Sequence, residues 1–228
     1  TGLTAYAVTG WSQEGGVWYY YESDGEYAYD EWKRSGDNYF YLGSDGAMLT
    51  STLIDDGSNL YYVDENGAMV ENQWVMLDDE TAGTDTESGY VWYYFGSNGR
   101  AYKKSSSSTS VSKRTINGKT YAFDEEGRML YGWVDESGNL LTDDDDPFTS
   151  ASYYFGDWND GAMLTSSWYE YTEGTDATSN VSSVDYSDYE TLWFYFGSNG
   201  KMYRAEDEEV ITKTIGGVKY AFDQNGVM

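Results

Sequence analysis

Four-residue aromatic segments recur along the chain, and a turn that contains glycine follows each one. Within every segment the second and fourth residues are apolar or aromatic, whereas the first and third range from Trp and Tyr to Thr, Ser, Lys and Ala. Because side chains alternate between the two faces of a β-strand, the pattern predicts strands with one constant and one variable face. The segments span residues 18–21, 39–42, 60–63, 92–95, 120–123, 152–155, 193–196 and 219–222. The turn glycines are Gly25, Gly46, Gly67, Gly99, Gly127, Gly161, Gly200 and Gly226.

A preceding strand supplies one more large side chain in most units. These residues are Trp11, Trp32, Leu53, Trp74, Trp133 and Trp168. The fifth and eighth units lack this Trp and have the tight turns 116–119 and 215–218, which are typical of two-residue β-hairpins. A lone hairpin is marginal in water, whereas stacking buries the constant face of each unit against its neighbour. The sequence therefore predicts an all-β fold, a solenoid of stacked β-hairpin repeats, with one array of about eight units over residues 1–228.

The spacing of the units varies because the hairpin tips carry insertions. The longest lie between Trp74 and Trp92, between Trp133 and Tyr153, and between Trp168 and Trp193. The serine stretch 105–108 and the acidic run 143–146 are predicted to be solvated loops. The chain starts at Thr1 without a signal peptide and stops inside a repeat at Met228, so we expect a fragment of a longer precursor.

Composition excludes several classes of chemistry. Cysteine and histidine are absent, which removes disulfides, thiolate catalysis and every His-based triad or metal site. A glycosidase would need two carboxylates held at a set separation in a cleft, whereas the acidic residues here cluster in turns and hairpin tips. The run 143–146 lacks the alternating ligands and the glycine of a calcium-binding EF-hand loop. We therefore predict a protein that is not an enzyme and that needs no metal or cofactor.

Charge limits the partners in the same way. The chain has 40 Asp plus Glu against 13 Lys plus Arg, a formal net charge of −27. Such a surface repels nucleic acid and anionic lipid, both of which need basic residues to displace counterions. No run of about 18 apolar residues is present, so no membrane insertion is expected. A cationic ligand is compatible with this charge, and the sequence does not indicate an oligomeric state.

Several motifs resemble the cell-wall-binding repeats of Gram-positive surface proteins, whose best-known members are choline-binding modules. They are Gly10-Trp11, the strand 17–21 and Asp24-Gly25, with further matches at 45–48, 66–69 and Gly132-Trp133. The segment 115–124 looks more like the related repeats of glucan-binding proteins and clostridial toxins. The resemblance covers the chain from about Trp11 to Met228.

The resemblance implies binding sites in the form of aromatic cages between consecutive hairpins. Carried over by position, one cage comprises Trp11, Trp18 and Tyr41. A second comprises Trp32, Tyr39 and Tyr62, with Met48 and Met69 as flanking contacts. Ring faces of this kind attract a quaternary ammonium group without any catalytic residue.

Other intervals depart from the pattern of the family. Leu53 and Leu60 supply no ring, so the third interval is expected to be empty. Trp74 with Trp92, and Trp168 with Trp193, are predicted to meet Ala122 and Ala221 where the third ring should be. These intervals are predicted to be partial cages or flat platforms of the kind on which sugars stack.

The resemblance implies a non-catalytic module that anchors a secreted protein to the bacterial surface. Its expected partner is a cell-wall polymer, either choline-bearing teichoic acid or a polysaccharide, and its expected location is extracellular and associated with the cell wall. Two alternatives stay open at this point. One is binding of glucan or a surface glycan, which the incomplete cages favour. The other is a structural or adhesive spacer that displays the hairpin insertions to a protein partner.

Overall fold

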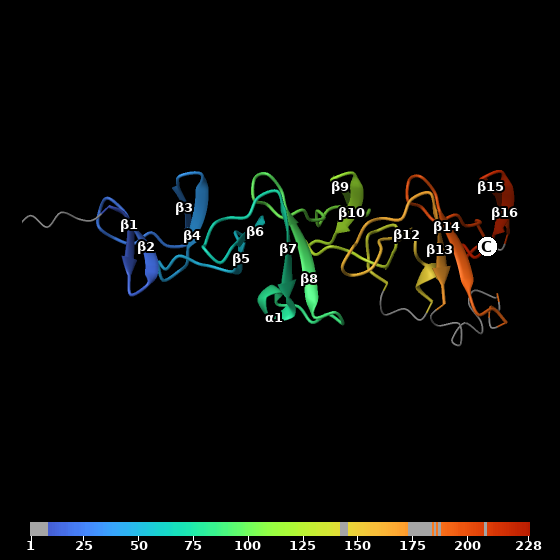
Figure 1. The fold of residues 1–228 in the computed structure, drawn as a ribbon, viewed down its shortest axis with the longest axis horizontal. Coiled ribbons are helices and arrows are strands. Elements are labelled where there is room, and N and C mark those ends of the chain that lie inside the picture. Colours follow the sequence, from blue (N-terminus) through green and yellow to red (C-terminus); the bar gives the residue numbers. More distant parts are fainter. Residues whose placement is uncertain (1–8, 142–145, 173–183, 185, 187, 208) are drawn as a thin grey trace, which may run out of the picture. The chain divides into compact units, whose positions relative to one another are not determined.

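The computed structural model describes residues 9–141, 146–172, 184, 186, 188–207 and 209–228. Within these residues the strands pair two by two, in chain order, into eight antiparallel hairpins (Figure 1). The predicted all-β fold of stacked hairpins is confirmed. The strands are β1 (Gly10–Glu14), β2 (Val17–Tyr21), β3 (Glu31–Ser35), β4 (Asn38–Leu42), β5 (Thr52–Asp55), β6 (Leu60–Val63), β7 (Gln73–Asp78), β8 (Tyr90–Phe95), β9 (Ser112–Ile116), β10 (Lys119–Phe123), β11 (Trp133–Val134), β12 (Tyr153–Tyr154), β13 (Ser167–Tyr171), β14 (Leu192–Phe196), β15 (Ile211–Ile215) and β16 (Val218–Phe222).

Two compact units make up the chain, residues 1–102 and 103–228. The first contains β1 to β8 and the second β9 to β16, and each is described by itself. The single continuous array stays a prediction. Among the described residues, no helix is long and apolar enough to cross a membrane.

Burial of the strand residues follows the two predicted faces. The fourth position of the second strand is fully buried from the second hairpin onward, as in Leu42, Phe95 and Phe222, each 0% exposed. The first position is never fully buried, and its exposure reaches 39% at Trp18 and 37% at Trp193. Within each unit the core therefore consists of small clusters between hairpins, because each hairpin alone is too thin to enclose its apolar side chains.

A recurring hydrogen bond ties neighbouring hairpins together within each unit. The amide of Met48, in the loop after β4, donates to the carbonyl of Trp18 in the preceding hairpin at 2.8 Å. The same bond joins Met69 to Tyr39, Ala101 to Leu60, Met163 to Thr120, Met202 to Ser152 and Met228 to Trp193. This bond fixes the loop of one hairpin over the first-position residue of the hairpin before it.

Several turn glycines lie directly against a methionine in the loop of the preceding hairpin. Gly67 has φ +80°, a backbone conformation that side chains rarely adopt, and a Cβ atom there would lie 2.8 Å from Cε of Met48. Gly99 is placed in the same way against Met69. Glycine recurs at this position because the turn lies directly on the preceding loop's methionine.

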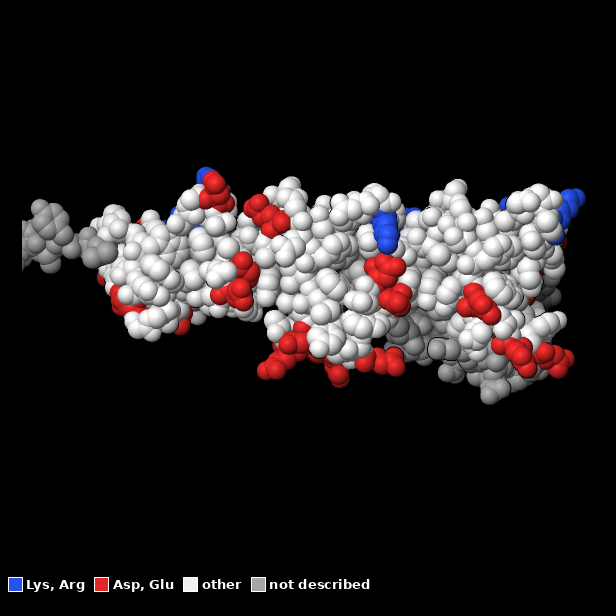
Figure 2. All heavy atoms as spheres, viewed as in Figure 1, with Lys and Arg blue, Asp and Glu red and all other residues white. Residues whose placement is uncertain are grey.

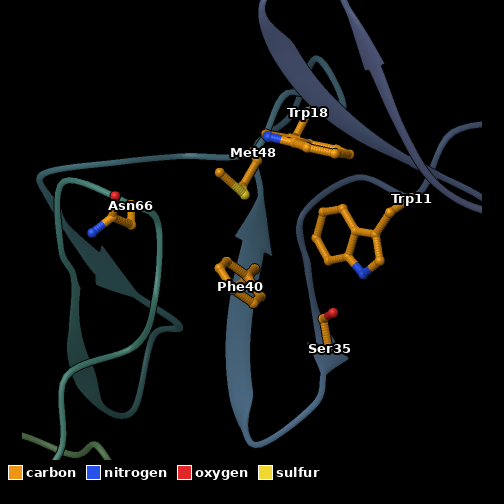
Figure 3. Close-up of a pocket in the computed structure, with 6 residues that line it drawn as sticks. All are labelled: Trp11, Trp18, Ser35, Phe40, Met48 and Asn66. Carbon is orange, nitrogen blue, oxygen red and sulfur yellow. The ribbon is translucent and has the colours of Figure 1, made fainter.

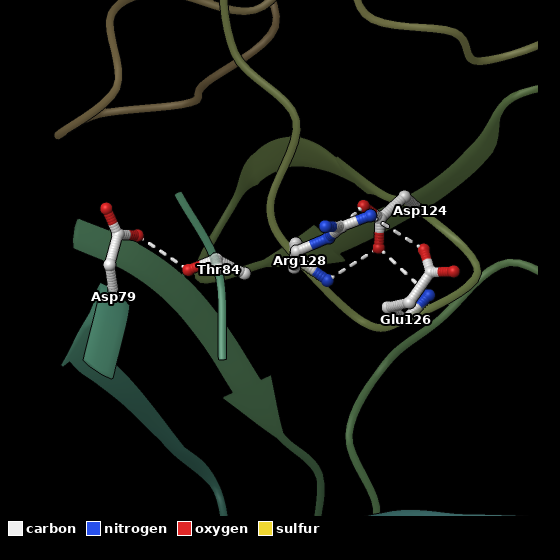
Figure 4. A network of polar contacts seen from close by, with 5 residues as sticks. All are labelled: Asp79, Thr84, Asp124, Glu126 and Arg128. Carbon is white, nitrogen blue, oxygen red and sulfur yellow. Dashed lines mark hydrogen bonds and ion pairs between the residues drawn. The ribbon is translucent and has the colours of Figure 1, made fainter. Parts of the chain in front are cut away.

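Many of the acidic residues have local structural roles. The carboxylate of Asp64 accepts hydrogen bonds from the amides of Asn66 and Ala68, which closes the turn after β6. Asp124 holds the turn after β10 in the same way and also pairs with Arg128, which contacts Glu126 as well (Figure 4). On the face drawn in Figure 2, acidic side chains form separate clusters with largely uncharged surface between them.

The three long insertions lie at hairpin tips, as predicted. The β7–β8 tip carries the short helix α1 (Asp79–Ala82), and the β11–β12 tip carries the 3₁₀ turn η1 (Pro147–Thr149). Asp143 to Asp145 and most of the β13–β14 insertion lie outside the described residues. In the α1 tip, Asp79 accepts a hydrogen bond from the Thr84 hydroxyl at 2.6 Å (Figure 4). It also accepts one from the Thr86 amide at 2.8 Å.

Candidate ligand site: aromatic cavities between hairpins

The space between two consecutive hairpins, here called a joint, is walled by opposite faces of the two. Trp11 in β1 pairs with Tyr20 in β2, so Trp11, Tyr20 and Trp18 point to the same side of the first hairpin. Phe40, in β4 of the next hairpin, faces back toward them, and its ring lies 5.5 Å from that of Trp11 at 75°. The forward face of one hairpin thus meets the backward face of the next.

The first joint contains an open cavity of about 230 Å³. Its lining residues are Trp11, Trp18, Ser35, Phe40, Met48 and Asn66. The side chains of Trp11, Trp18, Met48 and Phe40 turn toward a common space (Figure 3). The wall is mainly apolar, with no charged lining residue. It presents three aromatic rings and one polarizable sulfur.

The second joint contains a larger cavity of about 430 Å³. Its lining residues are Trp32, Tyr39, Tyr61, Met69, Glu71, Ser97 and Asn98. The Trp32 and Tyr61 rings meet edge to face at 5.3 Å between centroids, which repeats the geometry of Trp11 and Phe40. This cavity has one carboxylate and two further polar side chains at its rim, whereas the first has only Ser35 and Asn66.

The structure brings together most of the residues that the sequence assigns to the two cages. Trp11, Trp18 and Met48 line the first cavity. Trp32, Tyr39 and Met69 line the second.

Tyr41 and Tyr62, the third ring predicted for each cage, are not among the residues that line these two cavities. Phe40 and Tyr61 line the cavities, and each precedes by one residue the predicted Tyr41 or Tyr62. A shift of one residue along a strand moves a side chain to the other face.

Tyr41 and Tyr62 have structural contacts instead. Tyr41 pairs with Trp32 across its own hairpin at 5.1 Å between ring centroids. Tyr62 packs on Phe95 at 6.2 Å. Burial, the largest cause, raises the pKa of both tyrosines.

A third set of rings, not recognised as complete from the sequence, lies in the second unit. Trp168 contacts Tyr220 of the last hairpin at 4.8 Å between centroids. Trp193, which is exposed, precedes by two residues the Tyr195 that pairs with Trp168. The Met228 amide bonds to the Trp193 carbonyl at 2.9 Å, as Met48 does to Trp18. The sequence places Ala221 at the third-ring position. Ala221 lines a cavity with Trp193, whereas the residue that contacts Trp168 is Tyr220. The sequence does contain a signal for this ring, because the second residue of every strand segment is aromatic.

Two other joints are filled by the protein itself. Leu53 and Leu60 pack in an apolar cluster with Tyr93, so the third joint has leucines where the first joint has Trp11 and Trp18. In the second unit, Trp133 is only 7% exposed and contacts both Phe194 and Phe148, the latter from the β11–β12 insertion. The first residue of the strand segment in the same hairpin is Ser152, so no aromatic ring lies where Trp18 lies in the first joint.

Aromatic rings make up much of the wall of the open cavities. Aromatic ring faces carry partial negative charge and attract cations. Among the described residues, no group of three or more Asp or Glu side chains is arranged to hold a metal ion. The cavities therefore suit a small cation or a ligand that stacks on rings.

Comparison with known families found two matching repeat types. A model described as a choline-binding repeat matches residues 27–67, and a model described as a putative cell wall binding repeat matches residues 9–27, 87–101 and 193–202. A search of curated proteins found no match.

Solved structures with the same fold come from Streptococcus pneumoniae. The modular autolysin LytC is 21% identical, with a TM-score of 0.57, and the match covers 96% of this chain and 38% of that one. Choline binding protein F is 22% identical, with a TM-score of 0.54 and coverage of 96% and 57%. The chain thus spans well under two thirds of each relative. At this identity the likeness shows the fold.

Proposed function

Because this chain belongs to the cell-wall-binding repeat family of the choline-binding type, we propose that its joint cavities hold quaternary ammonium groups. By this means it anchors a secreted protein to the choline-bearing polymer of a bacterial cell wall. The proposed role is non-catalytic, and the proposed location is extracellular, at the wall.

The observation that carries the proposal is the first cavity. Trp11, Trp18 and Phe40 offer three ring faces around a space of about 230 Å³, and Met48 closes it. A trimethylammonium group is apolar on its surface and carries one positive charge, so it gains both contact area and cation–π attraction there. Each such contact contributes about 0.5–2 kcal/mol, depending on how far the cation is desolvated. The net charge of −27 adds a long-range attraction for cations.

Repetition of the site suits a repetitive ligand. The Trp32, Tyr39 and Tyr61 cavity and the Trp168, Trp193 and Tyr220 set offer the same types of ring. When several weak sites engage one polymer, later contacts form at a high effective concentration, and overall affinity exceeds that of any single site. An anchoring function needs this behaviour, because each cavity alone is small.

A second candidate, binding of a glycan, is favoured by one observation. Glu71, Ser97 and Asn98 line the second cavity beside Trp32 and Tyr39. Sugars commonly bind through a ring that stacks on an aromatic face together with hydrogen bonds at the rim. The first cavity offers fewer polar groups, so this candidate concerns the second joint alone.

Calorimetric titration with choline and with its neutral carbon isostere, dimethylbutanol, tests the proposal. Choline should bind saturably and dimethylbutanol much more weakly, because only choline carries the charge that the rings attract. Trp18→Ala should remove one site. Trp158→Ala is the matched control, since Trp158 has a similar exposure of 36% and lines none of these cavities. Equal binding of both compounds, or no binding of either, would refute a cation-binding role.

A further inference from the structure

The joint between the β9–β10 and β11–β12 hairpins has a lysine at a strand position where five other hairpins have a tryptophan. In five hairpins a Trp of the first strand pairs with the third-position Tyr of the second strand. These Trp residues are Trp11, Trp32, Trp74, Trp133 and Trp168. In the β9–β10 hairpin the same register pairs Lys113 with Ala122. A lysine thus stands at the position of the cage tryptophan.

The Lys113 side chain reaches the ring that the tryptophan meets elsewhere. Its Nζ atom lies 4.5 Å from the centroid of Tyr153, the second-position residue of the next hairpin. Trp11, Trp32 and Trp168 contact Phe40, Tyr61 and Tyr220 at the same position, with centroids 4.8–5.5 Å apart. Tyr153 is 3% exposed, so the ring that receives the ammonium group is nearly closed to water.

The rest of this joint offers no cage for an outside ligand. The first-position residue is Thr120, where the open cavities have Trp18 or Tyr39. Glu136, which pairs with Lys201 at 2.6 Å, also interacts electrostatically with Lys113. The ammonium group therefore has a ring face and a neighbouring negative charge, which are the features that favour a bound cation.

We propose that this joint is closed by the chain's own cation, Lys113 on Tyr153, and that it takes no external cation, because Thr120 leaves it without an outer ring. The second half of this inference rests on the proposed function. The joint that contains the lysine is held together without ligand, whereas joints with a Trp and an exposed first-position ring stay open for ligand.

Lys33 shows that a nearby lysine alone does not have this effect. Its Nζ atom lies 4.8 Å from the Tyr20 centroid in the first joint, and it pairs with Glu22 and Glu31. It contacts the third-position ring rather than the second and does not line the cavity. Trp11 retains its place there, so the cavity stays open.

Thermal unfolding of the full chain with Lys113 replaced tests the first half. Lys113→Met keeps a long apolar stem and removes the charge, and it should lower Tm by about 2–6 °C, the range expected for loss of one desolvated cation–π contact. Lys113→Arg should retain the wild-type Tm. Lys119→Met on the same hairpin is the control, because Lys119 is exposed and its carboxylate partner Asp160 lies 3.7 Å away.

A double-mutant cycle with Tyr153→Leu isolates the contact from general packing. The loss caused by Lys113→Met should disappear when the ring is absent, because the two residues then have no mutual attraction to lose. An equal loss with and without the Tyr153 ring, or equal Tm values for Lys113→Met and Lys113→Arg, would overturn the inference. These measurements use no ligand, so their outcome is separate from that of the proposed function.

Choline titration of Lys113→Met tests the second half. The number of choline sites should equal that of the wild type, since the joint lacks a first-position ring even when the lysine is gone. Stability, not site count, is the property that should change. A coupled Lys113–Tyr153 pair in a chain that ignores choline would refute the proposed function and leave the closed joint standing. A gain of one choline site in Lys113→Met would overturn the assignment of Thr120 as the missing wall.

Discussion

Trp11 and Trp133 occupy the same strand position in two joints, yet their surroundings differ. Trp11 lines an open cavity with Trp18 and Phe40. Trp133 is 7% exposed and lies among Phe148, Tyr154, Tyr169, Tyr171, Phe194 and Phe196. Both meet a second-position ring of the next hairpin. The difference lies in what covers the outer side.

Two local features account for that difference. The first-position residue beside Trp133 is Ser152, which supplies no outer ring. The β11–β12 insertion then folds back and places Phe148, which is 0% exposed, against the indole. The side-chain nitrogens of Arg204 hold this insertion by donating to the carbonyls of Phe148, Thr149 and Ala151 at 2.6–3.1 Å. A tryptophan in this repeat is therefore a ligand wall or a core residue according to its neighbours.

The largest effect should come from removing the enclosed tryptophan. We expect Trp133→Ala to lower the free energy of unfolding by about 3–5 kcal/mol, because it leaves a cavity among many packed rings. Choline binding at the other joints should persist under conditions where the variant is folded. Urea-induced unfolding, followed by near-ultraviolet circular dichroism, measures the loss. A cost below about 1 kcal/mol would show that Trp133 is not a core residue.

An intermediate effect, on binding rather than stability, is expected at the open joint. Trp18→Ala should cost less than about 1 kcal/mol of stability, since Trp18 is 39% exposed. Phe155→Ala, on the fully buried face, should cost about 3–5 kcal/mol and serves as the matched comparison. Affinity for choline at the first joint should fall about tenfold or more in Trp18→Ala, the loss of one or two ring contacts. Equal destabilisation by the two substitutions would contradict the distinction between the two faces.

The smallest effect is expected at the α1 tip and depends on pH. The hydrogen bond from the Thr84 hydroxyl, and after it that from the Thr86 amide, lower the pKa of Asp79. A carboxyl whose pKa is lower in the folded state stabilises the fold above its unfolded pKa of about 3.9, and this contribution is lost as pH falls through the folded value. Asp79→Asn should therefore be less stable than the wild type at neutral pH and nearly equal at strongly acidic pH. Thermal melts across this range measure the difference, and a gap that widens on acidification would contradict the assignment.

The hairpins could be predicted from the sequence because their signals are local. Strand alternation and the turn glycines act within about 20 residues. The unit from Trp11 to Gly25 contains both signals. The buried fourth positions, such as Leu42 and Phe95, follow from the same alternation. The pattern also separates Trp18 from the core correctly.

The third ring of each cavity could not be identified by the same reasoning. The second-position residues are uniformly aromatic or apolar, so they read as packing residues only, yet Phe40 and Tyr61 are also cavity walls. Each joint is closed by the backward face of the next hairpin. The alternation pattern of a single strand does not indicate which residues of the next hairpin face the joint. The path of the insertion that brings Phe148 onto Trp133 is likewise a long-range property. The same holds for the reach of Lys113 to Tyr153.

The crystal structure of the chain with bound choline tests the central claim most directly. We predict a trimethylammonium group among Trp11, Trp18, Phe40 and Met48, in contact with the Phe40 ring and not with Tyr41. The Lys113–Tyr153 joint should hold no choline. Choline against Tyr41, or empty cavities at saturating choline, would contradict the account of these joints as cation sites.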